Sequence, residues 1–290
     1  MRRTEEGLLM LTCALGQNVQ PLTNGELQYM EKLVLRLPPP EREVEISEAF
    51  FRSLGYSGPQ SARFVGLLNR KNALHSYLSA PGIKVVTRLS CDYPERLQLL
   101  RAQMPTALFC KGNTSLLHTR CVALVGSRAI TARNRAFAER IGALAAQEGL
   151  TLVSGGAVGA DSAAQNACLR AGGSVICFVP DSLSRYREHP NLLYCSDEGW
   201  DLGFSASRAL RRNHYIHALG EKTFVASCPL PKGGTWSGTC YNLNHRLSEV
   251  YILDDNTEGT RLLTSMGAVA VSDALASIET LLPSELSIFD

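Results

Sequence analysis

Three short apolar runs alternate with two segments of helical pattern between residues 122 and 180, and this alternation limits the folds open to the chain. The apolar runs cover residues 122–125, 150–153 and 174–179, and the helical segments cover residues 131–148 and 162–170. Each run is too continuous for a half-exposed strand and is typical of a strand buried on both faces. The alternation therefore predicts an α/β fold with a mostly parallel sheet covered by helices.

The loops after the first two runs are rich in glycine and hydroxyl side chains. In a parallel sheet, ligands bind beyond the carboxyl ends of the strands, which is where both loops fall. The amino terminus of the helix that follows each loop favours an anion at the same place. We therefore predict that the chain binds a ligand that carries phosphate groups.

The first of these loops contains Gly126, Ser127 and Arg128. Glycine allows a ligand to approach the backbone closely, and an arginine can hold a phosphate through two parallel hydrogen bonds. An ordinary strand-to-helix turn with a solvated arginine explains the same tripeptide. The loop alone leaves both interpretations open.

The second loop is more specific, because Gly155, Gly156 and Gly159 follow Ser154 within five residues. It does not match the GxGxxG pattern of dinucleotide sites, and it lacks the Lys-Ser/Thr pair of a P-loop. A standard NAD site or ATPase is therefore disfavoured. For Asp161, at the end of the loop, we predict a helix-capping role.

A third candidate site combines Lys232, in a Gly- and Thr-rich loop, with a helix expected over residues 205–219. That helix carries Arg212 and Asn213, together with Arg208 and Arg211. A solvated basic helix face explains the arginines without a ligand, yet the helix ends close to the same sheet. For Trp236 we predict packing under the loop rather than stacking on a base.

Composition restricts the other classes of site. The net charge of +2 gives no global nucleic-acid signature, so such a role needs a local basic patch. The nine cysteines are scattered and without a CxxC pair, which favours reduced thiols over disulfides or zinc. His214 and His217 lie three residues apart but lack a third metal ligand. We predict no metal site, no cofactor and no catalytic nucleophile with its base.

The chain divides into two predicted domains, a helical one over residues 1–80 and a Rossmann-like one over residues 81–290. The expected amino-terminal helices cover a first apolar segment within residues 1–16 and residues 26–37, 46–54 and 61–80, with Pro38, Pro39 and Pro40 ending the second. Further expected strands cover residues 83–87, 107–110, 192–195, 223–227, 250–253 and 269–271. Further expected helices cover residues 205–219, 239–247 and 257–266, with a short one from Tyr93-Pro94-Glu95 to Leu99.

The apolar run near the amino terminus is too closely preceded by Glu5 and Glu6 for a signal peptide. No segment approaches the roughly 20 apolar residues that span a bilayer. We therefore expect a cytoplasmic protein without a membrane association.

The order and spacing of several short motifs over residues 82–270 resemble the DNA-processing protein A (DprA/Smf) family. These motifs are Tyr93-Pro94 with Leu97, Phe109 with Lys111-Gly112-Asn113, Val125-Gly126-Ser127-Arg128, Ser154-Gly155-Gly156-Ala157 with Gly159 and Asp161, Pro190-Asn191-Leu192, Arg212-Asn213 with Ile216, and Gly234 with Gly238-Thr239. The resemblance implies an extended Rossmann-like fold that binds single-stranded DNA, forms a homodimer and helps to load a RecA-type recombinase during natural transformation.

By position, the resemblance makes Arg128 the phosphate-holding arginine, places residues 154–159 along the anion pocket, and matches Arg212 and Asn213 to the family's Arg-Asn pair. The chain departs from the family where Ala164-Gln165 replaces an Ala-His dipeptide. Because the sequence runs to Asp290, we also expect no winged-helix domain of the kind that some members carry.

A nucleotide-binding sensor or a phosphoribohydrolase that cleaves nucleoside monophosphates is the alternative on the same fold. Those enzymes need a catalytic Glu beside a glycine-rich loop, and none follows within residues 232–239. For the expected homodimer, the apolar segments 251–253 and 266–271 are candidate contacts, with completion of the core as the alternative for Ile252 and Leu253.

Overall fold

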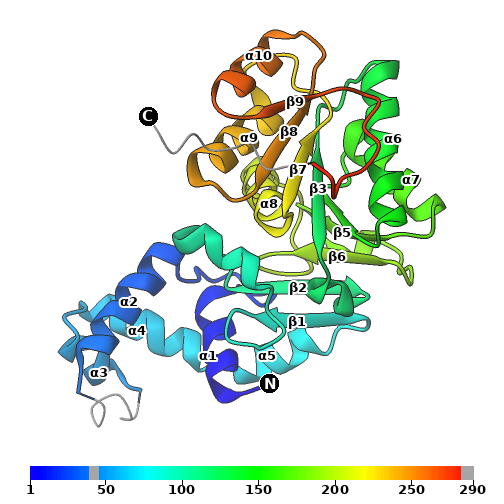
Figure 1. Cartoon of the computed structure of the whole chain (residues 1–290). Coiled ribbons are helices and arrows are strands. Elements are labelled where there is room, and N and C mark those ends of the chain that lie inside the picture. The colour runs from blue at the N-terminus through cyan, green and yellow to red at the C-terminus, as the bar shows by residue number, and fades with distance from the viewer. Residues whose placement is uncertain (39–45, 282–290) are drawn as a thin grey trace.

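The computed structural model describes residues 1–38 and 46–281, so Pro39, Pro40 and the end of the predicted carboxy-terminal domain lie outside the described residues (Figure 1). A nine-stranded sheet runs through the described part in the order β1-β2-β6-β5-β4-β3-β7-β8-β9. Its strands are β1 Ile83–Thr87, β2 Ala107–Gly112, β3 Cys121–Val125, β4 Thr151–Ser154, β5 Ser174–Phe178, β6 Leu192–Ser196, β7 Lys222–Val225, β8 Glu249–Leu253 and β9 Val269–Val271.

Every pairing from β6 across the sheet to β9 is parallel, and only β1 and β2 run antiparallel to their neighbours among the described strands. The predicted α/β fold with a mostly parallel, Rossmann-like sheet is confirmed. The order also has a switch point. β4, β5 and β6 are added on one side of β3, and β7, β8 and β9 on the other. The loops that follow β3 and β7 therefore diverge at the carboxyl ends of these two strands. Such sheets bind ligands at this point.

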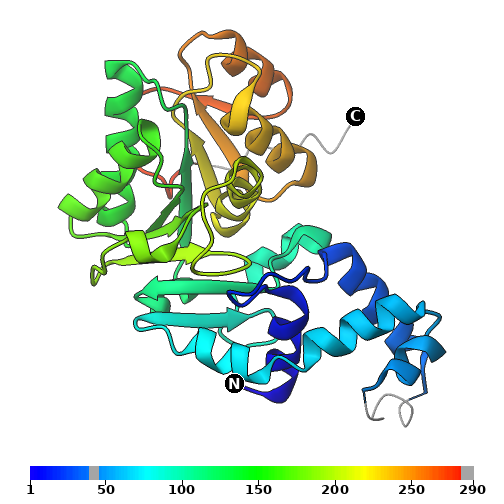
Figure 2. The ribbon, with the colours of Figure 1, turned by 180° about the vertical axis from the view of Figure 1, so that it is seen from behind.

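Helices cover both faces of the parallel part of the sheet (Figures 1 and 2). Alternate residues of β3 show the two layers. Val122 and Leu124 pack with residues of α6 and α7, whereas Ala123 and Val125 pack with residues of α8. This period of two explains why the strand sequence is apolar throughout. The helices are α6 Ala132–Gln147, α7 Ala160–Arg170, α8 Ala206–Leu219, α9 Gly233–His245 and α10 Glu258–Ser265.

Helix α9 begins six residues before the predicted start at residue 239, so the predicted loop at Gly233 and Gly234 is its first turn. The glycine-rich sequence here serves close helix packing. A β-carbon on Gly238 would lie 3.2 Å from Cβ of Asn213 on α8. Glycine therefore lets α9 approach α8 closely, a non-local reason that local pattern does not reveal.

The amino-terminal part contains α1 Arg3–Thr12, α2 Asn24–Arg36, α3 Glu48–Ser53, α4 Gly58–Leu68 and α5 Lys71–Leu78. The single helix predicted over residues 61–80 is wrong, because α4 and α5 are separated at Arg70. The Arg70 guanidinium is buried and donates to the carbonyls of Cys13 and Ala14, each at 2.9 Å. It thereby satisfies carbonyl groups just beyond the end of α1.

The amino-terminal helices divide between two apolar clusters. Leu9 of α1 and Leu74 of α5 belong to the same cluster as the strands. Leu27 of α2 and Phe64 of α4 belong to a separate cluster. The predicted short helix from Glu95 is a longer 3-10 segment, η2 Glu95–Gln103, which is kinked at Arg101. Two further 3-10 helices are η3 Thr114–His118 and η4 Leu183–Arg185.

Of the two segments suggested as dimer contacts, residues 251–253 lie in the interior and residues 266–271 are partly exposed. Tyr251 is 1% exposed, and Ile252 and Leu253 are fully buried, because β8 lies between β7 and β9. These three residues complete the core and form no outer surface. Met266 of the second segment is 40% exposed.

Candidate functional site

A cavity of about 410 Å³ lies at the switch point of the sheet. Two loops and two helices form it: the loop after β3, the loop between β4 and α7, the start of α9 with Lys232 before it, and α8 with Phe204 before it. The lining residues are Val125, Gly126, Ser127, Arg128, Ala157, Asp161, Phe204, Ala206, Ala209, Leu210, Arg212, Asn213, His217, Lys232, Gly233, Gly234 and Thr235.

The structure brings most of the predicted site residues to this cavity. Those that line it are Gly126, Ser127, Arg128, Arg212, Asn213 and Lys232. The other four are not in the lining: Ser154, Gly155 and Gly159 are buried, and Gly156 is exposed. Ser154 is the last residue of β4 and is fully buried, accepting a hydrogen bond from Gln165 Nε2 at 2.8 Å.

The glycines of the second loop make close contacts with other parts of the chain. A β-carbon on Gly155 would collide with the guanidinium of Arg212. A β-carbon on Gly159, whose φ is +103°, would collide with the carbonyls of Ser127 and Arg128. The glycines therefore do allow another group to approach the backbone closely, as the sequence predicted. The approaching groups are the Arg212 side chain and the first loop. These glycines shape the cavity from behind.

Asp161 holds the second loop and pairs with Arg212. Its Oδ2 accepts hydrogen bonds from the backbone N–H of Gly155 at 3.2 Å and of Ala157 at 3.4 Å. The same oxygen lies 3.9 Å from Nη1 of Arg212. The predicted capping role is wrong, since Gly159 occupies the cap position of α7 and Asp161 lies in the first turn. Burial raises the pKa of Asp161, and the nearby Arg212 opposes that rise.

Arg212 is the central cation of the cavity. The residue is 8% exposed, and its Nε and Nη1 atoms are buried with no hydrogen-bond partner among the described residues. A buried donor without a partner costs about 1–3 kcal/mol, and more when it is charged. The only compensation in the described structure is the distant contact with Asp161. The guanidinium is therefore available to an acceptor that enters the cavity.

Two exposed cations lie at the edge of the same cavity. Arg128 follows β3, and Lys232 precedes α9; neither side chain has a hydrogen-bond or ion-pair partner in the described part of the chain. No side chain caps the amino terminus of α9, and Gly233, Gly234 and Thr235 of its first turn also line the cavity. Free backbone N–H groups at a helix start favour an anion. Cationic side chains and a helix terminus thus converge on one space.

Ser127 and Asn213 connect the elements around the cavity. The Ser127 hydroxyl and backbone N–H both donate to the carbonyl of Ser227, at 3.3 and 3.0 Å, which joins the loops after β3 and β7. Asn213 Nδ2 donates to the carbonyl of Gly234 at 3.1 Å, which joins α8 to the start of α9. Both residues therefore hold the cavity walls in position.

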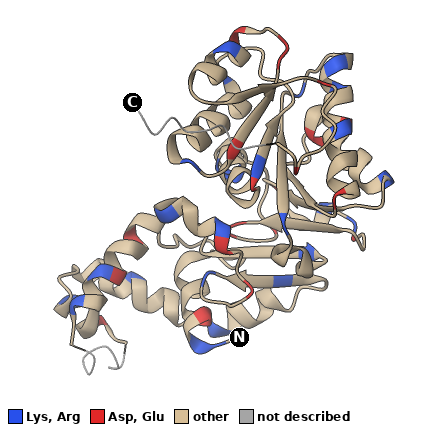
Figure 3. Ribbon diagram, viewed as in Figure 1, with Lys and Arg blue, Asp and Glu red and all other residues tan. Residues whose placement is uncertain are grey.

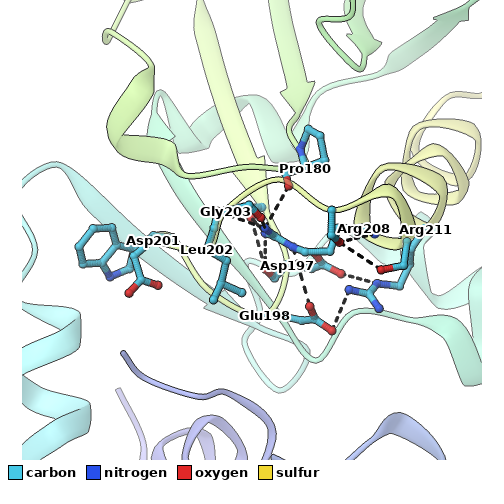
Figure 4. Close-up of polar contacts among 12 residues, drawn as sticks. Pro180, Asp197, Glu198, Asp201, Leu202, Gly203, Arg208 and Arg211 are labelled. Carbon is cyan, nitrogen blue, oxygen red and sulfur yellow. Dashed lines mark hydrogen bonds and ion pairs between the residues drawn. The ribbon is translucent and has the colours of Figure 1, made fainter. Parts of the chain in front are cut away.

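The other two arginines of α8 anchor the segment that leads from β6 into α8 (Figure 4). Arg208 is 6% exposed and donates to the carbonyls of Pro180 at 3.0 Å and Gly203 at 2.9 Å. Arg211 Nε donates to Asp197 Oδ2 at 2.7 Å, and Tyr215 donates to the same oxygen at 2.8 Å. The interpretation of a solvated basic face is wrong for Arg208 and Arg212, which are buried.

Sequence reasoning missed two parts of this cavity and one buried residue outside its lining. Phe204 and Leu210 are apolar and lie on the rim, 59% and 47% exposed. His217 lies in the lining although it is fully buried. Asp197 is the buried partner of Arg211. The sequence did contain a signal for Asp197, because the acidic pair at residues 197–198 directly follows a predicted strand. The carboxyl ends of parallel strands lie at one edge of the sheet, so this pair could be expected near the other loops.

The charge is not concentrated on one face of the molecule. Figure 3 shows Lys and Arg interspersed with Asp and Glu over both the helical part and the sheet. The basic character of the cavity is therefore local to its lining, where Arg128, Arg212 and Lys232 gather.

Within residues 1–38 and 46–281, no group of three or more His, Cys, Asp or Glu side chains is arranged to hold a metal ion. In the same residues, no helix combines the length and the apolar character needed to cross a membrane.

Two curated relatives are similar to the chain in sequence. Protein Smf of Escherichia coli strain K12 is 28% identical over 262 residues, which cover 83% of this chain and 68% of that protein. The DNA processing protein DprA of Streptococcus pneumoniae is 30% identical over 193 residues, which cover 60% of this chain and 67% of that protein.

Solved structures show the same fold. The X-ray structure of DprA from Streptococcus pneumoniae matches with a TM-score of 0.68 at 22% identity, covering 87% of this chain and 96% of that one. DNA processing protein A from Helicobacter pylori, solved to explain its single-stranded DNA binding mode, matches with a TM-score of 0.56 at 25% identity, covering 65% of this chain and 90% of that one.

The strongest assignment comes from a family model. The model of DNA recombination-mediator protein A matches residues 84–282, which include every strand except the first residue of β1. The match spans both loops of the cavity, the start of α9 and the whole of α8. Because it covers more than half of the 290 residues, the chain belongs to the family of DNA recombination-mediator protein A.

Proposed function

We propose that the protein binds single-stranded DNA at the switch-point cavity and does so without chemical catalysis. The observation that carries the proposal is the buried guanidinium of Arg212, whose Nε and Nη1 lack partners in the described structure. Arg128, Lys232 and the start of α9 surround the same space. A phosphodiester group supplies the negative charge and the acceptor oxygens that this set of donors lacks.

The rim of the cavity supports a strand over an isolated anion. Phe204 and Leu210 are exposed apolar side chains beside the cationic lining. Proteins that bind single strands combine a cationic groove for the backbone with aromatic surfaces on which bases stack. The relative from Helicobacter pylori, described for its single-stranded DNA binding mode, agrees with this ligand class.

The cellular role follows from family membership and remains part of the proposal. We propose that the bound strand is processed in DNA uptake or recombination in the cytoplasm, where the protein protects it and aids a RecA-type recombinase. We also propose a homodimer, because two linked sites on one strand raise the effective affinity without new contacts. Light scattering over a range of protein concentrations tests the dimer, and a monomer with and without oligonucleotide would contradict it.

Fluorescence anisotropy with a labelled oligothymidylate tests the DNA proposal. Affinity should fall steeply as salt rises, because each phosphate contact releases condensed counterions. Competition by an unlabelled duplex should be weaker than competition by an unlabelled single strand. Absence of binding at low salt, with protein of native circular dichroism, would reject the proposal.

A nucleotide-binding protein is the second candidate, and the size of the cavity favours it. A volume of about 410 Å³ lies in the range of small-molecule sites. Asp161 is the acidic residue of the lining, and its Oδ2 is already occupied by two backbone N–H groups. The lining therefore offers hydrolysis no carboxylate other than Asp161, whose Oδ2 holds the second loop. Incubation with nucleoside monophosphates, followed by chromatography for released base, distinguishes hydrolysis from binding.

A further inference from the structure

The imidazole of His217 is a buried polar group in the cavity lining that the phosphate-holding arginines do not explain. The residue is fully buried and lies on α8, and its Nε2 atom has no hydrogen-bond partner among the described residues. The other ring nitrogen, Nδ1, lies 3.0 Å from Nδ2 of Asn242 on α9. The roles of both nitrogens follow from the groups around Asn242.

The orientation of the Asn242 amide is determined by the backbone. The N–H of Ser248 donates to Asn242 Oδ1 at 2.9 Å, so the amide oxygen faces Ser248. The amide nitrogen therefore faces His217 and donates to its Nδ1. A neutral imidazole that accepts at Nδ1 carries its proton on Nε2. Burial lowers the pKa of His217 to about 3, which keeps the ring neutral near pH 7.

The unpartnered Nε2–H is thus a hydrogen-bond donor in the lining of the cavity. The side of the ring that carries Nε2 is kept clear by Gly238 of α9, on which a β-carbon would lie 3.1 Å from that atom. Arg212 lies five residues earlier on the same helix, and its Nε and Nη1 atoms have no hydrogen-bond partner in the described structure. Both residues are more than nine-tenths buried, and buried donors normally have an acceptor.

We infer that His217 binds the ligand directly, by donating its Nε2–H to a phosphate oxygen beside the Arg212 guanidinium. The unpartnered groups around this space are all donors, and the start of α9 adds backbone N–H groups to them. The edge of a nucleobase presents donors as well as acceptors, whereas a phosphate oxygen presents acceptors only. A phosphate therefore matches the set. The inference rests on the proposed function for the source of this phosphate, a DNA strand.

The test uses the full chain and three variants. His217→Phe removes the donor and keeps a ring, and affinity for oligothymidylate should fall by about 2- to 13-fold, the range of one neutral hydrogen bond. His217→Gln places an amide donor at similar reach and should lose less affinity than His217→Phe. His214→Phe is the matched control on the same helix, outside the lining, and should bind as the parent protein does.

A second measurement separates direct contact from an effect on folding. In the unsubstituted protein labelled with ¹⁵N, the imidazole signals of His217 should report a proton on Nε2, and that signal should shift on addition of oligothymidylate. If thymidine monophosphate or inorganic phosphate shifts it and the oligonucleotide does not bind, the His217 contact stands and the DNA proposal fails. An unmoved Nε2 signal at saturation with bound oligonucleotide, or binding by none of these probes, overturns the inference.

Discussion

The guanidinium of Arg212 lies against the backbone of Gly155, in the space that a β-carbon at residue 155 would occupy. The second glycine-rich loop thus makes room for the buried cation of the cavity. The same loop is held from the other side by Asp161, which accepts from the Gly155 N–H at 3.2 Å. The loop, the carboxylate and the arginine form one unit, and this relationship leads to the first prediction.

Gly155→Ala should weaken DNA binding about as much as Arg212→Ala, because the methyl group displaces the guanidinium from the cavity. The stability of the fold should change less, since the colliding atoms are the flexible end of a side chain. Anisotropy titrations with oligothymidylate measure the effect. Gly66→Ala is the control: this glycine lies in α4 with no atom within 4 Å of the added carbon, and its affinity should be unchanged. Equal binding by Gly155→Ala and the parent would contradict the assigned packing.

Arg128→Ala should reduce affinity for all single strands to a similar degree, since a phosphate contact carries no base preference. It should also lower the slope of log affinity against log salt by about 1. Titrations at several salt concentrations with strands of different sequence measure both effects. Arg3→Ala, an exposed arginine on α1, should leave both quantities unchanged. A slope that does not differ between Arg128→Ala and the parent would remove Arg128 from the site.

Asp197→Asn should destabilise the fold by at most about 3 kcal/mol, the lower end of the scale for a fully buried ion pair, because the Arg211 side chain is 32% exposed. Asp197 is 6% exposed and lies 2.7 Å from Arg211 Nε. The substitution keeps the shape and leaves Arg211 with the half-exposed Glu198 alone (Figure 4). Urea unfolding measures the change. Asp92→Asn, an exposed partner of His118, is the control with little expected effect. Similar midpoints for the two variants would show that the buried pair contributes little.

Stability should fall as the pH decreases from about 6.5, because the histidine of the cavity is buried as a neutral ring. Burial lowers the pKa of His217 from 6.5 to about 3, and that of His214 to about 4. Between these values and 6.5 the unfolded chain binds protons that the folded chain does not. One such histidine lowers the free energy of unfolding by up to about 1.4 kcal/mol per pH unit in that window. Urea unfolding at several pH values should show a shallower dependence for His217→Gln, and an identical dependence would contradict the prediction.

Local pattern was sufficient for the sheet and for the position of the cavity. The apolar runs at residues 122–125, 150–153 and 174–179 became β3, β4 and β5, because strands buried on both faces are mostly apolar. The Gly126–Arg128 loop, Lys232 and the Arg212-Asn213 pair then met at one edge, since parallel strands end there. Boundaries failed where a non-local contact was involved, as at Arg70, which lies between α4 and α5 and donates to the carbonyls of Cys13 and Ala14.

The sequence by itself determined that helices cover a mostly parallel sheet and which loops lie at the same edge of that sheet. These features follow from periodicity and chain connectivity. Only the tertiary structure decided what each polar group in those loops does. Gly155 faces Arg212, Asp161 holds a loop, and His217 presents a donor, because each role depends on residues brought together from distant parts of the chain. Periodicity reports which face a side chain occupies, and it contains no information about which partner it meets there.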